Sequence, residues 1–237
     1  MASFSGKTVF VTGATRGIGL AIARAFQDYG AKVIGTGTTD ARQANLDGYF
    51  QADFSEIGQI NACADFIRKN KPDVLINNAG INRNLPFLEI KPELFQEIQQ
   101  VNLFAPFILC QAALPAMKEK NWGRIVNISS IWGKISKAHR ASYSASKFAL
   151  DGLTAALAAE FASNGILANC VSPGFTDTEL TSQTLGEKGI EQILKTVPIG
   201  RMARPEEIAN LVLWLGSDKN EYVSGQNISI DGGFTRV

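Results

Sequence analysis

The chain has 237 residues, of which 45% are hydrophobic and 19% charged, and its net charge is +1. This length suits one domain with a large core, and the balanced charge gives no indication of nucleic acid or an anionic membrane as a partner. No apolar run approaches the roughly 20 residues of a membrane span and the N-terminus has no secretory signal pattern, so we expect a cytoplasmic protein.

Cysteine and histidine usage argues against a metal centre. Cys63, Cys110 and Cys170 are odd in number and widely scattered, so we expect buried free thiols in a reducing compartment. His139 is the only histidine, which excludes a multi-histidine metal site. We therefore predict no bound metal.

Short apolar runs alternate with amphipathic segments along the chain. The runs predict strands at Thr8–Val11, Lys32–Gly35, Tyr49–Ala52, Val74–Ile76, Arg124–Ile128, Leu167–Val171 and Asn227–Ile230. Helical spacing separates several of them, for example at Ile18, Ile22, Ala25 and Tyr29. This alternation predicts an α/β fold: a single-domain, Rossmann-type, doubly wound parallel sheet of about seven strands with helices on both faces. No linker divides residues 1–237, and the long irregular stretch from Pro173 to about Gly189 predicts a substrate lid at about 173–200.

A glycine-rich loop, Thr12-Gly13-Ala14-Thr15-Arg16-Gly17-Ile18-Gly19, follows the first predicted strand and opens the first helix. Glycines at these points let the backbone turn tightly and approach a diphosphate, which the free N–H groups of a helix N-terminus bind. A tight turn without a ligand is the alternative, but the position between strand and helix favours a dinucleotide.

The second predicted strand indicates which dinucleotide. It ends in Thr36-Gly37-Thr38-Thr39, with no acid before Asp40, whereas an NAD site usually carries an acid about 20 residues after the loop. Arg16 and the threonine hydroxyls suit a 2′-phosphate. We predict NADP(H); the alternative is that Asp40 binds the ribose of NAD(H).

Tyr143 and Lys147 lie four residues apart in a segment with helical character. Residues at this spacing share one helical face, so we expect the phenol and the ammonium to converge. A cation favours the ionised phenol, which makes Tyr143 a candidate general acid; a solvated helix face is the alternative.

Several motifs then occur in one order along the chain: residues 12–19, Asn77-Asn78-Ala79-Gly80, Asn102, Ser129-Ser130, Tyr143-x-x-x-Lys147 and Pro173-Gly174. This order resembles the short-chain dehydrogenase/reductase family over essentially the whole chain. Within the family the sequence is most similar to the bacterial 3-oxoacyl-acyl-carrier-protein reductases.

The resemblance implies roles for particular residues. Tyr143 protonates the carbonyl oxygen, Ser130 hydrogen-bonds the same oxygen, and Lys147 lowers the pKa of Tyr143 and holds the nicotinamide ribose. Asn102 holds a water that links Lys147 to solvent. The sequence itself adds that Pro106 cannot donate to the Asn102 carbonyl, which leaves that carbonyl free for the water; the alternative is that Pro106 only starts or kinks the helix. The implied cofactor contacts are Gly13, Thr15, Arg16, Gly17, Ile18, Gly19, Thr38, Asp53, Phe54, Asn77, Ala79, Gly80, Tyr143, Lys147, Pro173, Gly174, Thr176 and Thr178. Without the resemblance, Asp53, Asn77 and Thr178 are better explained as turn or helix caps.

The resemblance implies an NADPH-dependent oxidoreductase of fatty acid biosynthesis that reduces a 3-oxoacyl thioester on acyl carrier protein. Reductases of this kind carry two surface arginines for the acidic carrier, and the matching positions here are Asn121 and Asn164. Lys118, Lys120 and Arg124 are the cations that could compensate.

Other functions stay open. The chain could act on another alcohol or ketone, such as a sugar or a small ketone, or be a non-catalytic NADP(H) sensor or a methyltransferase with a similar loop. Family members commonly form dimers or tetramers, so we also expect a homotetramer or homodimer.

Overall fold

A computed structural model describes residues 3–39 and 45–237 of the chain. Its seven strands form one sheet in the order β3-β2-β1-β4-β5-β6-β7, and every neighbouring pair is parallel. The strands are β1 (Thr8–Val11), β2 (Lys32–Gly37), β3 (Gly48–Gln51), β4 (Val74–Asn77), β5 (Gly123–Ile128), β6 (Ile166–Pro173) and β7 (Asn227–Ile230). The predicted fold class is confirmed, with strand ends shifted by one or two residues.

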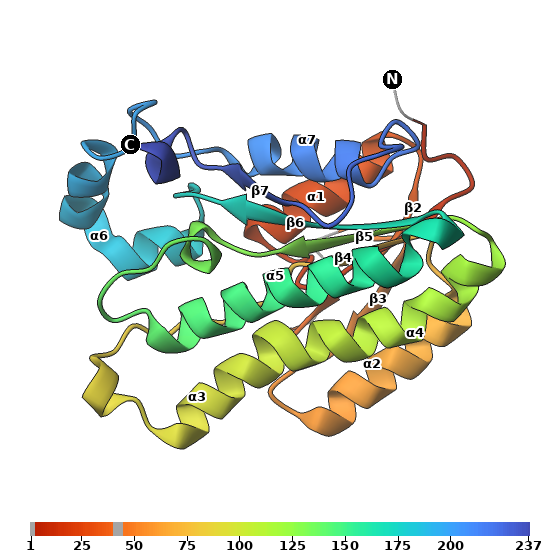
Figure 1. Cartoon of the computed structure of the whole chain (residues 1–237), viewed down its shortest axis with the longest axis horizontal. Coiled ribbons are helices and arrows are strands. Elements are labelled where there is room, and N and C mark those ends of the chain that lie inside the picture. The colour runs from red at the N-terminus through yellow and green to blue at the C-terminus, as the bar shows by residue number, and fades with distance from the viewer. Residues whose placement is uncertain (1–2, 40–44) are drawn as a thin grey trace.

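Helices cover both faces of the sheet (Figure 1). They are α1 (Gly17–Asp28), α2 (Ile57–Asn70), α3 (Pro92–Gln99), α4 (Ala105–Glu119), α5 (Ala141–Phe161), α6 (Glu179–Leu194) and α7 (Pro205–Leu215). One apolar core lies between the sheet and α2, α4 and α5, and a second lies between the sheet and the paired helices α1 and α7. The strands are therefore buried on both sides, which explains why they are continuous apolar runs.

The strand order reverses between β1 and β4, because β2 and β3 lie on one side of β1 and the later strands on the other. Ligands of open parallel sheets bind in the crevice at the carboxyl ends of the strands, at such a switch point. The glycine-rich loop follows β1, and Asn77 ends β4 with Asn78-Ala79-Gly80 directly after it, so both motifs border this crevice.

The lid differs from the sequence-based expectation. The stretch predicted to be irregular is helical over much of its length, because α6 runs from Glu179 to Leu194 with a break at Gly186 (φ 62°, ψ 173°). Figure 1 shows α6 standing beyond the sheet, near the C-terminus. The segment predicted to be a lid thus contains a broken helix at the edge of the molecule, and its role as a lid remains a prediction.

The run from Pro92 to Glu119 joins α3, a π-helical turn at Gln100–Phe104 and α4. Among the described residues it is the one helical run long and apolar enough to cross a membrane, by length and composition alone. However, 61% of its apolar window is buried within the fold, as in a core helix.

Candidate active site

The glycine-rich loop is shaped for close approach to a ligand. Gly13 has a φ of 65°, and a Cβ on Gly19 would lie 2.1 Å from the Gly13 carbonyl oxygen, so loop and helix pack too tightly for a side chain there. Arg16 occupies the N-cap of α1 without a side-chain capping bond. The first amides of α1 therefore lack a side-chain acceptor and can bind an anion.

Asn78 and Thr12 hold this loop against the end of β4. The Asn78 amide nitrogen donates to the carbonyls of Thr12 (3.0 Å) and Gly13 (3.1 Å). The Thr12 hydroxyl in turn accepts from the backbone N–H groups of Asn78 and Ala79, both at 2.9 Å. Sequence reasoning did not assign either residue, although their position beside the motifs is a signal that could have indicated them.

The end of the site predicted to hold the 2′-phosphate is open. Arg16 is largely exposed, and its guanidinium lies 3.5 Å from the carboxylate of Glu179 at the start of α6. The carbonyl of Thr38 accepts a hydrogen bond from Gln51, which orders the end of β2. Asp40, the alternative ribose ligand, lies outside the described residues.

Three further predicted cofactor contacts have structural partners. The Asp53 carboxylate accepts from the N–H and hydroxyl of Ser55, and Phe54 is buried in the core. Asn77 is buried and donates to Asn127 (2.8 Å), while its own oxygen has no hydrogen-bond partner among the described residues. Their contacts with a cofactor remain predictions.

Tyr143 and Lys147 project from the first turns of α5 on one side, as their spacing predicts. The Lys147 ammonium lies 5.6 Å from the centre of the Tyr143 ring and donates to the Ile128 carbonyl (2.8 Å) at the end of β5. Ser130, two residues beyond that strand, lies close enough to the Tyr143 phenol to lower its pKa through hydrogen bonding. The adjacent Ser129 points elsewhere, to the Lys147 carbonyl. The structure therefore brings Ser130, Tyr143 and Lys147 together.

The electrostatics differ from the expectation that Lys147 lowers the pKa of Tyr143. Burial raises the pKa of the Tyr143 phenol above its usual value, while the Ser130 hydrogen bond and the positive charge of Arg140 oppose this shift. Burial also lowers the pKa of Lys147 from 10.5 to about 8. Arg140, which sequence reasoning missed, is thus the cation that acts on the phenol, and the net shift of Tyr143 is upward.

Asn102 joins the loop after β4 to α5. Its side chain accepts from the Ile81 N–H (2.8 Å) and donates to the Ile81 carbonyl (2.9 Å) and to the Ser146 hydroxyl (3.0 Å). It lies in the π-helical turn just before Pro106, and the water contact of its carbonyl remains a prediction. A Cβ on Gly80 would lie 3.2 Å from the Asn102 oxygen and 3.6 Å from the Lys147 nitrogen.

The segment that leads from β6 into α6 adjoins the glycine-rich loop. A Cβ on Gly17 would lie 3.5 Å from the Thr178 methyl group, and the Thr178 hydroxyl caps α6 by accepting from the Thr181 N–H. Thr176 is buried and forms a parallel bridge with Ala203. Pro173 ends β6, and Gly174 packs directly against Asp231. Segments distant in sequence thus meet around one crevice.

An aromatic cluster lies beside Ser130. The backbone N–H of Trp132 donates to the Ser130 hydroxyl, and the Trp132 ring meets the rings of Phe175 and Phe234 edge-on at centroid distances of 6.4 and 6.2 Å. The Arg140 guanidinium lies 5.3 Å from the centre of the Trp132 ring. This apolar wall with one buried cation flanks Tyr143.

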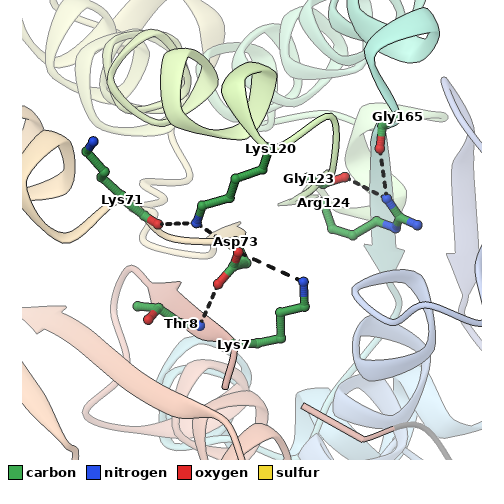
Figure 2. A network of polar contacts seen from close by, with 8 residues as sticks. All are labelled: Lys7, Thr8, Lys71, Asp73, Lys120, Gly123, Arg124 and Gly165. Atoms are coloured by element: carbon green, nitrogen blue, oxygen red, sulfur yellow. Dashed lines mark hydrogen bonds and ion pairs between the residues drawn. The ribbon is translucent and has the colours of Figure 1, made fainter. Parts of the chain in front are cut away.

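Asn121 and Asn164 lie at the opposite edge of the sheet. Each lies two residues before a strand, Asn121 before β5 and Asn164 before β6, whereas Ser130 follows β5, and six strand residues span about 20 Å. Lys120 pairs there with the buried Asp73 (2.9 Å), and Arg124 is buried and bonded to carbonyl oxygens (Figure 2). Of the three cations suggested to compensate, Lys120 is thus ion-paired and Arg124 is buried, whereas Lys118 is exposed on α4. A role of these cations with a carrier remains a prediction.

The three cysteines are free and buried, as predicted. Burial raises the pKa of each thiol to about 12, so none is a nucleophile at neutral pH. Within the described residues, no three His, Cys, Asp or Glu side chains gather into a possible metal site.

A doubly wound parallel sheet with a glycine-rich loop at its switch point, and a Ser–Tyr–Lys set beside it, defines a dinucleotide-dependent oxidoreductase. The chain belongs to the short-chain dehydrogenase/reductase family: residues 13–235 match the family model described as enoyl-(acyl carrier protein) reductase.

Individual relatives agree with this assignment. The chain is 38% identical to the 3-oxoacyl-[acyl-carrier-protein] reductase FabG of Salmonella typhimurium, over 99% of this chain and all of the relative. A crystal structure from Beutenbergia cavernae, described as an NAD(P)-dependent gluconate 5-dehydrogenase with bound NADP, superposes with a TM-score of 0.95 at 34% identity and 99% coverage of both chains. A gluconate 5-dehydrogenase from Burkholderia cenocepacia, in complex with NADP and tartrate, gives 0.91 at 30% identity, covering 99% of this chain and 97% of that one.

Proposed function

We propose that this chain is an NADP(H)-dependent oxidoreductase that interconverts a ketone and a secondary alcohol, with Asn102, Ser130, Tyr143 and Lys147 as its active-site residues. The observation that carries the proposal is the convergence of Ser130, Tyr143 and Lys147 from β5 and α5 at the carboxyl edge of the sheet. A dinucleotide sensor would not need a proton donor hydrogen-bonded to a second hydroxyl there.

Each residue has a distinct task in reduction. Ser130 and Tyr143 both hydrogen-bond the carbonyl oxygen, and Tyr143 gives up its proton to that oxygen as negative charge develops on it. Because burial keeps the phenol protonated, the acid is present at neutral pH. Lys147, with its pKa lowered to about 8, can exchange a proton near neutrality, and Asn102 fixes the adjoining loop and α5 around it.

The cofactor fits the residues present. The crowded Gly13–Gly19 contact and the amides of α1 form a cradle for a diphosphate, and Arg16, Thr15 and Thr38 would hold the 2′-phosphate. When bound, NADPH supplies the hydride. Gly17, Ile18, Asp53, Phe54, Asn77, Ala79, Gly80, Pro173, Gly174, Thr176 and Thr178 are the further contacts that we propose.

Two substrate classes are candidates. The curated relative favours a 3-oxoacyl thioester carried on acyl carrier protein, as in fatty acid biosynthesis. The solved structures favour a sugar acid. The neutral Asn121 and Asn164, at the edge away from Tyr143, weaken the case for an acidic carrier and support the second class.

NADPH oxidation separates these possibilities. The purified chain should oxidise NADPH with a 3-oxoacyl thioester or with a keto sugar acid, and should prefer NADPH to NADH. Binding of NADPH without turnover of any ketone would leave a non-catalytic NADP(H) sensor as the remaining function. A preference for NADH would contradict the proposed binding of the 2′-phosphate by Arg16.

We further propose that the chain acts in the cytoplasm as a homodimer or homotetramer. A groove of about 620 Å³, lined by Phe95, Gln96, Gln99, Gln100, Leu103, Phe104, Phe107 and Leu153, crosses the outer face of α3, α4 and α5. Phe95, Phe104, Phe107 and Phe148 are all exposed on these helices, and such apolar faces favour self-association. Light scattering of the purified chain would decide its assembly state.

A further inference from the structure

Arg140 is a cation with little exposed surface, and the described residues supply no counter-charge for it. It is only 7% exposed, yet among the described residues no carboxylate pairs with its side chain and no acceptor takes a hydrogen bond from it. Its neighbours are the Trp132 ring, 5.3 Å away, and the Tyr143 phenol. Buried guanidinium groups are normally paired or fully hydrogen-bonded, because removing an unpaired charge from water is costly.

The same chain shows how a buried guanidinium is satisfied by the fold itself. Arg124 is similarly buried and stacks on Trp122 at 4.5 Å. It also donates to the carbonyls of Gly123 and Gly165 (Figure 2) and to those of Ser217 and Asn220, at 2.8–3.2 Å. Arg140 has the ring contact without the carbonyl oxygens. Its N–H donors are therefore available to a group that comes from outside the fold.

The position of Arg140 connects it with the reacting carbonyl. It directly precedes α5, three residues before Tyr143, and its ring partner Trp132 lies two residues after Ser130. Ser130 and Tyr143 define where the carbonyl oxygen binds, and the guanidinium contacts the Trp132 ring and acts on the Tyr143 phenol, so it lies near that point. The rest of this wall, formed by Trp132, Phe175 and Phe234, is aromatic.

We propose that Arg140 binds a carboxylate of the substrate beside the ketone, so that the substrate is a keto acid and its reduced partner a hydroxy acid. This inference rests on the proposed function and chooses between its two substrate classes. A planar guanidinium binds a carboxylate through two parallel hydrogen bonds, and its burial strengthens them. A 3-oxoacyl thioester carries no negative charge next to its ketone and leaves Arg140 unpaired.

The test compares matched ketones with and without the charge. NADPH oxidation is measured with a 3-oxo acid and its methyl ester, and with a six-carbon keto sugar acid and its amide. The variants are Arg140→Gln and, as a control, Lys137→Gln. The Lys137 ammonium lies 5.3 Å from the centre of the same Trp132 ring but is exposed. Its removal therefore takes away a nearby cation and leaves the buried Arg140 guanidinium in place.

We expect the wild type to prefer the acids to their neutral partners. In Arg140→Gln, kcat/KM for the acids should fall about 10- to 100-fold further than for the neutral ketones, the loss expected for a charge-assisted hydrogen-bond pair. Competitive inhibition by tartrate should weaken by a similar factor. Lys137→Gln should leave the ratio of kcat/KM for each acid to that for its neutral partner, and the inhibition by tartrate, near their wild-type values.

Other outcomes would overturn the inference. Equal losses for acids and esters in Arg140→Gln would mean that Arg140 acts only through Tyr143 or through the fold. A wild type that prefers the esters, or the thioester, would show that no carboxylate is bound. Absence of turnover with every ketone, with NADPH still bound, would instead contradict the proposed function.

Discussion

Replacing Lys147 by methionine should stabilise the fold at neutral pH while removing activity. Burial lowers the pKa of Lys147 from 10.5 to about 8, so the folded state holds this proton less tightly than the unfolded state. Below about pH 8 both states are protonated, and the folded state bears a constant penalty of about 3 kcal/mol. Between about pH 8 and 10.5 the unfolded state binds more protons, so stability rises with pH and the penalty disappears.

The size of the effect follows from two opposing contributions. Lys147→Met removes the charge penalty, but it also leaves the Ile128 carbonyl without its 2.8 Å donor, which costs about 1 kcal/mol. A net gain of about 2 kcal/mol is therefore expected at pH 7, and at this chain length it corresponds to about 4–8 °C in Tm. Near pH 11 the gain should become a loss of about 1 kcal/mol.

Urea unfolding of the cofactor-free protein at pH 7 and at alkaline pH measures this prediction. Lys118→Met is a suitable control, because Lys118 lies exposed on α4 and its removal changes the net charge equally. If Lys147→Met were no more stable than wild type at pH 7, or if its difference from wild type did not change with pH, the reasoning on buried charge would be refuted.

Two further substitutions test the cradle and the proton donor. Gly19→Ala places a methyl group 2.1 Å from the Gly13 carbonyl oxygen, so NADPH affinity in a fluorescence titration should fall at least about tenfold. The control is Gly58→Ala, whose methyl group meets open space, and it should change NADPH affinity little. Unchanged affinity in Gly19→Ala would contradict the cradle. Ser130→Ala removes a hydrogen bond that lowers the pKa of Tyr143. The alkaline limb of the pH–rate profile for reduction should therefore move to higher pH, while turnover falls about 100-fold. An alkaline limb at the wild-type pH would show that the Tyr143 phenol is not the group that titrates there.

The sheet and the cofactor loop could be predicted from the sequence because their signals are local. Strands buried on both faces are continuous apolar runs, and the glycines of residues 12–19 occur where one backbone must approach another. The pairing of Tyr143 with Lys147 follows from helical geometry alone. These features depend on neighbours in sequence.

Features that depend on tertiary neighbours were missed. Arg140 is one of several basic residues before a helix, and only the packed fold shows that it is buried beside Tyr143 with no carboxylate partner among the described residues. The upward pKa shift of Tyr143 has the same origin, since burial outweighs the nearby charge. The helix α6 was predicted to be irregular, and the break at Gly186 divides it into two short pieces.

The central claim is that the Tyr143 phenol protonates the substrate carbonyl. The most direct measurement is NADPH oxidation by Tyr143→Phe, with NADPH binding measured in parallel on the same preparation. We expect turnover to fall by about 100- to 10,000-fold, as for loss of a general acid, while the dissociation constant for NADPH stays within about threefold of wild type. Turnover close to the wild-type rate, with binding intact, would contradict the account.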